Sequence, residues 1–147
     1  MFKNDKSKAT GKLIVEIKND KGVVVETREV KNLVVDDGLE FIASRMKDAT
    51  ATAMSHMAIG TGSTAAAASD TALGTEAARQ GLTSTTVTAN AVAYVASFAA
   101  GTGTGAITEA GILNASSGGS LLCRTVFSVV NKGASDSMTI TWTVTIS

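Results

Sequence analysis

The sequence has few of the residues that most often carry chemistry. It contains one cysteine, one histidine and no run of about 18 uninterrupted apolar residues. With Cys123 as the single cysteine, no intrachain disulfide can form, and its apolar neighbours predict a small buried side chain. The polar N-terminus lacks the apolar stretch of a signal peptide. We therefore expect a protein that is made in a cytoplasm and has no membrane partner.

The charge is balanced overall but unevenly distributed. Thirteen Lys and Arg residues offset thirteen Asp and Glu residues, so no long-range attraction to nucleic acid is expected. Eight of the basic residues lie in positions 3 to 31, whereas only four charged residues follow Leu82. The second half must cover its outside with Thr, Ser, Ala and Gly. Such a surface is easy to pack against another protein, which favours a subunit of an assembly.

No pattern in the sequence predicts a catalytic, cofactor or metal site. His56 lies on an alternating strand and has no partner at the spacing of a nucleophilic triad. The glycine-rich segments 60–62 and 101–105 lack the ending of a phosphate-binding loop, so we interpret both as ordinary loops. A hydrolase would need a pair of carboxylates in a cleft, and only Glu109 and Asp70 lie beside loops. We expect a protein that is not an enzyme.

The length of 147 residues and 44% hydrophobic content fit a single domain. Residues 1–11 are polar and without periodicity, which predicts a flexible N-terminal arm followed by one β-rich domain over 12–147. Alternating apolar residues then predict strands over 12–18 and 23–31. The segment between them, Asn-Asp-Lys-Gly, is typical of a tight turn, so these strands form a hairpin.

One short helix is expected, at about residues 37–48. Asp37 can cap its first turn while Glu40, three residues on, reaches back to the amide of the cap. Apolar residues follow at helical spacing, and Arg45 and Lys47 lie near the end, where the helix dipole favours cations. A further helical turn is expected at residues 75–80, where Glu76 and Arg79 can form an ion pair.

Short strands account for most of the remaining chain. We expect them at 55–60, 82–89, 91–99, 111–115, 121–130 and 138–146. The last alternates Met, Ile, Trp, Val and Ile with four threonines, which turns Trp142 inward and a threonine ladder outward. Tyr94 also falls on an inward face. The sequence therefore predicts a mainly β fold: an antiparallel sandwich, jelly-roll-like, with one short α-helix at one end.

Two segments resemble structural proteins of tailed bacteriophages. The first, IGTGSTAAAASDTALGTEAAR at 59–79, places Thr71, Leu73, Glu76 and Arg79 in the pattern T-x-L-x-x-E-x-x-R. The second, ITEAGILNASSGGSLLCRTVFS at 107–128, resembles the strand, turn and Arg-containing strand that follow. The same order occurs in tail-collar and tail-fibre N-terminal domains and in small head-decoration (cement) proteins. This chain stops after its last strand, whereas tail fibres usually continue into a shaft and a receptor-binding tip.

The resemblance implies a structural protein of the virion that acts by self-assembly and by binding other virion proteins. The implied partners are copies of itself, with a trimer favoured, and the major capsid protein or tail and collar proteins. Capsid decoration, a head fibre or a collar or tail-fibre adaptor would each fit. The alternative is a host-surface carbohydrate- or receptor-binding module that uses the loops at 60–70 and 101–105. Neither loop contains an aromatic residue to stack on a sugar.

Overall fold

The computed structural model describes residues 8–47 and 51–147. The fold is mainly β and antiparallel with one short helix, as predicted. The elements are β1 (Ala9–Lys18), β2 (Val24–Val34), α1 (Asp36–Lys47), β3 (His56–Gly60), β4 (Glu76–Gly81), β5 (Ser84–Thr88), β6 (Ala91–Phe98), β7 (Gly105–Leu113), β8 (Leu121–Lys132) and β9 (Ser137–Ile146). No helix of the described residues is long and apolar enough to cross a membrane.

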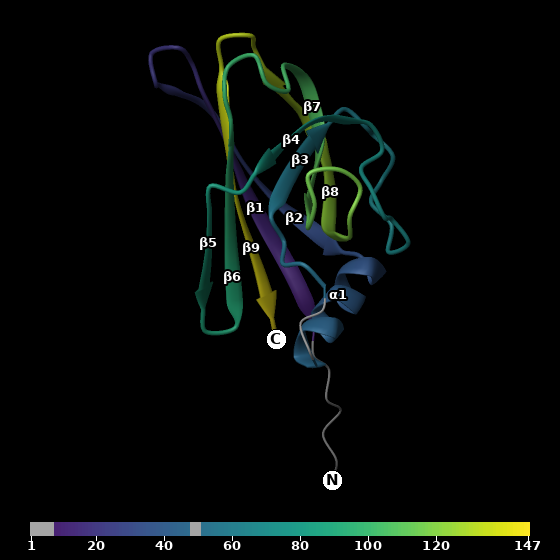
Figure 1. Cartoon of the computed structure of the whole chain (residues 1–147). Coiled ribbons are helices and arrows are strands. Elements are labelled where there is room, and N and C mark those ends of the chain that lie inside the picture. The colour runs from purple at the N-terminus through teal and green to yellow at the C-terminus, as the bar shows by residue number, and fades with distance from the viewer. Residues whose placement is uncertain (1–7, 48–50) are drawn as a thin grey trace.

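The nine strands form one curled sheet in the order β4-β3-β7-β8-β2-β1-β9-β6-β5. Figure 1 shows β1, β9, β6 and β5 on one side of the molecule and β3, β7 and β8 on the other, with α1 at one end. The two halves are joined where β2 pairs with β8 over a short register, Leu33 opposite Arg124 and Val34 opposite Cys123. The two layers of the predicted sandwich are therefore halves of one continuous sheet.

The core lies between these two halves. The period-2 pattern of the sequence accounts for it, because alternate residues of each strand point to the same face. Most of the predicted inward residues of β1 and β9 are buried, namely Leu13, Val15, Ile17, Met138, Ile140, Trp142 and Val144. The exception is Ile146, the last residue of β9, which was predicted to face inward but is 40% exposed. Tyr94 from β6 and Cys123 from β8 join the same core cluster, which confirms their predicted inward orientation.

The β1–β2 hairpin forms where it was predicted, with a turn held by the Asn19 side chain, whose Oδ1 accepts hydrogen bonds from the amides of Lys21 and Val23. The boundary of the predicted N-terminal arm was wrong. Residues 9–11 belong to β1 and pair with β9, because the C-terminal strand gives their amides and carbonyls partners. Residues 1–7 of that arm lie outside the described residues.

The predicted helix forms, although its cap differs from the prediction. The helix begins at Asp36 rather than at Asp37, and residue 48 lies outside the described residues. Asp37 instead accepts a hydrogen bond through Oδ2 from the amide of Leu121 at 2.8 Å. Its carboxylate therefore ties the first turn of α1 to the start of β8, a long-range contact that a local capping rule cannot anticipate.

The helical turn predicted at residues 75–80 was wrong. This segment is β4, which pairs along its length with β3. Its Ala, Arg, Gln and Glu residues favour a helix in isolation, but pairing with the buried strand β3 outweighs that weak local preference. In β7, pairing with β8 extends the strand back to Gly105, so that it covers 105–113 instead of the predicted 111–115.

Candidate functional site

A buried carboxylate, Glu109 of β7, lies at the centre of the polar network of the protein. Its Oε2 accepts hydrogen bonds from the amides of Gly62 at 2.6 Å and Thr75 at 2.7 Å. Its Oε1 accepts one from the amide of Gly74 at 2.7 Å and one from Nε of Arg124 at 3.1 Å. Each carboxylate oxygen thus has two donors, which fills its hydrogen-bonding capacity.

Arg124 of β8 connects this carboxylate to the loop between β3 and β4. Nη1 of Arg124 donates to Oδ2 of Asp70 at 2.8 Å, and Nη2 donates to the backbone carbonyl of Thr64 at 3.1 Å. Nη2 also lies 3.0 Å from Oε1 of Glu109. The β7–β8 register places Arg124 opposite Gly111, two residues from Glu109 on the same face, so the sheet itself brings the pair together.

The hydrogen bonds of this cluster keep both carboxylates ionised. Burial raises the pKa of Glu109, but the amides of Thr75, Gly74 and Gly62 together with Arg124 outweigh it and hold the pKa below its ordinary value. The pKa of Asp70 is lowered chiefly by the hydrogen bond from the amide of Ala67; burial opposes this shift, and Arg124 lowers the pKa further. A saturated carboxylate with a lowered pKa is poorly suited to accept a proton from a substrate.

The glycine-rich segment at 60–62 is shaped around this carboxylate. A Cβ added at Gly60 would clash with the backbone carbonyl of Thr75 and would lie 2.8 Å from Oε2 of Glu109, and one added at Gly62 would clash with the same carboxylate. Glycine is therefore required at both positions, since any larger residue would push the loop away from Glu109. The G-x-G pattern is explained by the backbone of Thr75 and the carboxylate of Glu109, and the loop needs no phosphate ligand to account for it.

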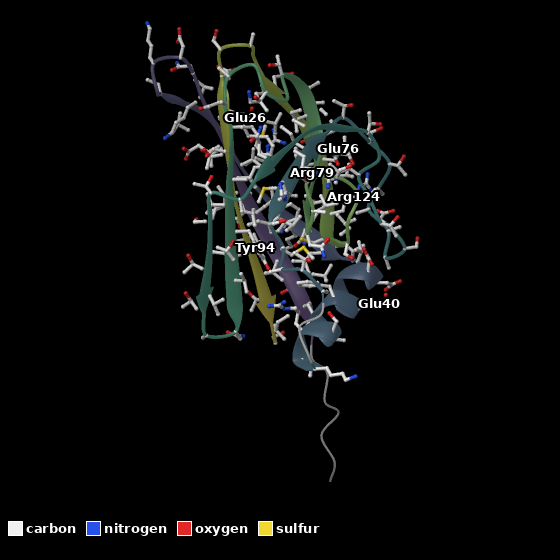
Figure 2. All side chains as sticks on the ribbon, viewed as in Figure 1. Glu26, Glu40, Glu76, Arg79, Tyr94 and Arg124 are labelled. Atoms are coloured by element: carbon white, nitrogen blue, oxygen red, sulfur yellow. The ribbon has the colours of Figure 1, made fainter. Side chains whose placement is uncertain are left out.

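Arg79 of β4 also joins separate segments through hydrogen bonds, as Arg124 does; it is labelled with Glu76 in Figure 2. We call each such side chain a clamp. Nη1 of Arg79 donates to the carbonyls of Ala115 and Gly118, each at 2.9 Å, and Nη2 lies 2.7 Å from Oε1 of Glu76. The predicted Glu76–Arg79 ion pair is confirmed, although on a strand rather than on a helical turn. Arg79 thereby holds the turn between β7 and β8 against the edge of the sheet.

A third clamp uses a buried lysine. Lys132 lies at the end of β8, and its Nζ donates to the carbonyls of Ala99 and Asp136, each at 2.8 Å. Burial lowers the pKa of Lys132, while the nearby charge of Asp136 opposes that shift. The two hydrogen bonds tie the β6–β7 and β8–β9 connections together at this end of the sheet. The glycine-rich segment 101–105 begins two residues after Ala99.

Sequence reasoning placed Glu109 and Asp70 beside loops but missed Arg124, which joins them. The signal that could have found the cluster is a charged residue inside an apolar strand, namely Glu109 in β7 and Arg124 in β8. His56 lies apart from the cluster and hydrogen-bonds through Nδ1 to Oγ of Ser55 at 2.8 Å. Within the ranges 8–47 and 51–147, no group of three or more His, Cys, Asp or Glu residues is arranged to hold a metal ion.

With these charges buried, the outer face of the second half is almost uncharged. Of the four charged residues after Leu82, Glu109 is 0% exposed, Arg124 2% and Lys132 1%, which leaves Asp136 as the one charged side chain in that half that is not buried. The threonines of β9 alternate with its buried residues and so face outward, where they meet outward residues of β1 and β6.

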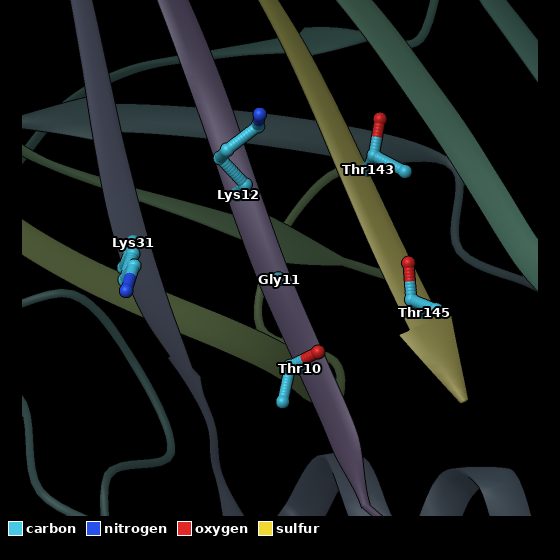
Figure 3. Close-up of a pocket in the computed structure, with 6 residues that line it drawn as sticks. All are labelled: Thr10, Gly11, Lys12, Lys31, Thr143 and Thr145. Atoms are coloured by element: carbon cyan, nitrogen blue, oxygen red, sulfur yellow. The ribbon is translucent and has the colours of Figure 1, made fainter. Parts of the chain in front are cut away.

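A shallow groove lies where the outward threonines of β9 meet the outer side of β1 and β2 (Figure 3). Its volume is about 590 Å³, and it is lined by Thr10, Gly11, Lys12, Lys31, Thr143 and Thr145. Lys12 lies directly opposite Lys31 on the neighbouring strand and also contacts Glu29 at 3.4 Å. The lining includes no aromatic side chain, so it offers no stacking platform of the kind that sugar sites use.

Comparison with known proteins identifies no relative: no family model, no curated protein and no solved structure matches this chain.

Proposed function

We propose that this chain is a structural protein of a tailed-phage virion, non-enzymatic, that assembles with copies of itself and with other virion proteins. Capsid decoration, a head fibre and a collar or tail-fibre adaptor are the roles that the resemblance of residues 59–79 and 107–128 favours. Its location would be the virion, reached from the cytoplasm of the host in which it is made.

The observation that carries this proposal is the nearly uncharged exterior of residues 83–147. A soluble domain that must remain free in solution usually covers roughly a quarter to a third of its surface with charged residues. Three of the four charged residues of this half have buried side chains that hydrogen-bond within the protein. Only Asp136 is not buried. A surface of Thr, Ser, Ala and Val has little charge to keep copies apart and little to desolvate, which favours burial against another protein.

The polar clusters support the same proposal by their chemistry. The segments that resemble phage proteins contain Glu109, Arg79 and Arg124. These side chains form hydrogen bonds with backbone amides and carbonyls, and Glu109 and Arg124 also bind each other. They fix long loops onto the sheet. Rigid loops present a fixed surface to a neighbouring subunit and lose little conformational entropy on docking.

The alternative function, a carbohydrate- or receptor-binding module, is less well supported. Tyr94 is 7% exposed and Trp142 is 0% exposed, so neither can stack on a sugar from the surface. The groove of Figure 3 is shallow and has no aromatic side chain in its lining, which fits a protein contact at least as well as a glycan.

The proposal is tested on particles and on the purified protein. Phage particles released from a bacterium that carries this coding sequence are purified by density, and the protein is sought in them with an antibody. Its presence in intact particles supports the virion role, and its absence from them overturns that role. The mass of the purified protein is then measured over a hundredfold dilution. A discrete oligomer supports self-assembly, and a folded monomer at every concentration contradicts it.

A further inference from the structure

The curled sheet has two free edges, β4 and β5, and they differ in chemistry. β4 carries Glu76 and Arg79 and lies against β6 of the other half of the sheet. β5 pairs on one side with β6, and among the described residues no strand pairs with its other side. Figure 1 shows β5 at the outer margin of the molecule. An edge of this kind presents unpaired amides and carbonyls to any strand that approaches.

β5 has none of the features by which natural sheets block such an edge. Proteins protect edges with charged residues, proline, bulges or a covering loop. β5 has the sequence Ser-Thr-Thr-Val-Thr, all five residues are exposed, and its register with β6 runs from Ser84 to Thr88 without a bulge. The neighbouring strand β6 is uncharged as well. The edge therefore has high β-propensity and nothing that repels a second strand.

We infer that β5 is the edge through which two copies of this chain pair, antiparallel and related by a two-fold axis near Thr86. This inference rests on the proposed self-assembly. In that register Ser84 of one copy lies opposite Thr88 of the other, and Thr85 lies opposite Val87. Thr–Thr, Thr–Ser and β-branched pairs are favourable across antiparallel strands, and no like charges meet. The layer β2-β1-β9-β6-β5 continues directly into its copy.

The charge of the edge selects a second copy over another kind of strand. A charged strand added to β5 would leave its charges without partners, because β5 and β6 contain no charged residue. A neutral Thr-rich strand has no such cost, and β5 itself is one. A two-fold pair also closes with a single interface, the commonest arrangement of homo-oligomers. It gives a dimer or an even-numbered assembly, in contrast to the trimer that the resemblance implies.

The sharpest test is a single cysteine on the two-fold axis. In an antiparallel pair, the residue on the axis faces its own copy with Cα atoms about 4.5 to 5.5 Å apart, within the range that a disulfide spans. The native Cys123 is buried, so it does not compete for the oxidant. Thr85→Cys, Thr86→Cys and Val87→Cys are compared with Ser117→Cys, an exposed position on the β7–β8 turn, after mild oxidation.

We expect a covalent dimer at one of the three β5 positions, with at least tenfold more dimer than for Ser117→Cys. Equal crosslinking at all four positions would reflect random collision and would overturn the inference. In parallel, Thr86→Lys should weaken the dimer at least tenfold in sedimentation, because two lysines would meet on the axis. Thr141→Lys, on the outer face of β9, should leave the dimer unchanged. Circular dichroism confirms that each variant is folded.

The outcomes separate this inference from the proposed function. If the wild-type protein is an oligomer, none of the β5 cysteines crosslinks and Thr86→Lys has no effect, then self-assembly stands and the β5 pairing is wrong. If the wild-type protein is a monomer at every concentration, both fail.

Discussion

At the scale of single residues, Glu109 is the side chain on which most depends. It is fully buried, and its two oxygens together accept hydrogen bonds from three backbone amides and Arg124. In Glu109→Gln, the new amide group would point a donor at one of these donors, and Arg124 would lose its buried counterion. We expect the free energy of unfolding to fall by about 3 kcal/mol, the scale of a broken buried ion pair. Urea denaturation followed by Trp142 fluorescence measures this loss.

The matched control is Glu29→Gln, which removes the exposed contact to Lys12 at 3.4 Å and should cost no more than about 1 kcal/mol. Equal losses for Glu109→Gln and Glu29→Gln would contradict the central role of Glu109.

The same carboxylate makes stability depend on acid. The pKa values of Glu109 and Asp70 are lowered in the folded state, so their contribution is fully present above the unfolded carboxyl pKa of about 4. It is lost as the pH falls through the lowered, folded-state values. The wild-type protein should therefore lose more stability between pH 5 and pH 3 than Glu109→Gln, which keeps only the contribution of Asp70. Urea titrations at several pH values test this difference, and parallel curves for the two proteins would contradict it.

Individual residues also set the limit of sequence reasoning. The alternation of β1 and β9 predicted their buried residues correctly except for the exposed Ile146 at the end of β9, because period 2 is a local property of a strand. Charged residues inside apolar strands point to Glu109 and Arg124 as candidates, but their contact could not be predicted, because it depends on the register of β7 on β8. The contact of Arg124 with Asp70 depends in addition on the path of the β3–β4 loop.

At the scale of elements, side chains on the strands hold the connecting loops in place through hydrogen bonds. Arg79 on β4 donates to the carbonyls of Ala115 and Gly118 and so fixes the turn between β7 and β8. In Arg79→Lys, a single ammonium replaces the planar fork that reaches both carbonyls. We expect a loss of about 1 to 2 kcal/mol, the scale of one or two charge-assisted hydrogen bonds, concentrated in local opening of this turn. Hydrogen exchange of peptides that cover 114–120 should be faster.

The control for this prediction is Glu76→Gln. It removes the ion pair to Arg79 but keeps the two hydrogen bonds to the turn, so the exchange of 114–120 should stay close to that of the wild type. If both variants accelerated exchange equally, the ion pair and not the carbonyl contacts would hold the turn.

The wrongly predicted element is β4. It shows why the type of secondary structure is harder to predict than which residues of a strand are buried. Residues 76–81 have the composition of a helix, and their strand conformation comes from pairing with β3, which lies on the other side of the long loop. Local preference is worth tenths of a kcal/mol per residue, whereas pairing with β3 gives hydrogen-bond partners to the amides and carbonyls on the inner side of β4 and to those of β3 that would otherwise be buried without partners. Such a segment follows its partner strand and not its own composition.

At the scale of the whole molecule, the first and last strands pair with each other in the middle of one half of the sheet. Ala9 lies opposite Ile146 and Leu13 lies opposite Trp142, so this half forms only after the full chain is available. Sheets dominated by such distant pairs fold in milliseconds to seconds. Trp142 is the single tryptophan and is fully buried, so its fluorescence reports this closure directly.

The chain contains no proline, which removes the commonest cause of slow folding. Stopped-flow refolding should therefore show no phase of tens of seconds that is independent of protein concentration. Any slow phase should instead be assembly, with a rate that rises in proportion to concentration. Thr86→Lys should remove this phase if β5 joins the copies, while the fast closure around Trp142 stays unchanged. A slow phase with a rate independent of concentration would contradict this prediction and would locate the barrier inside the monomer, in the long-range pairing of β1 with β9.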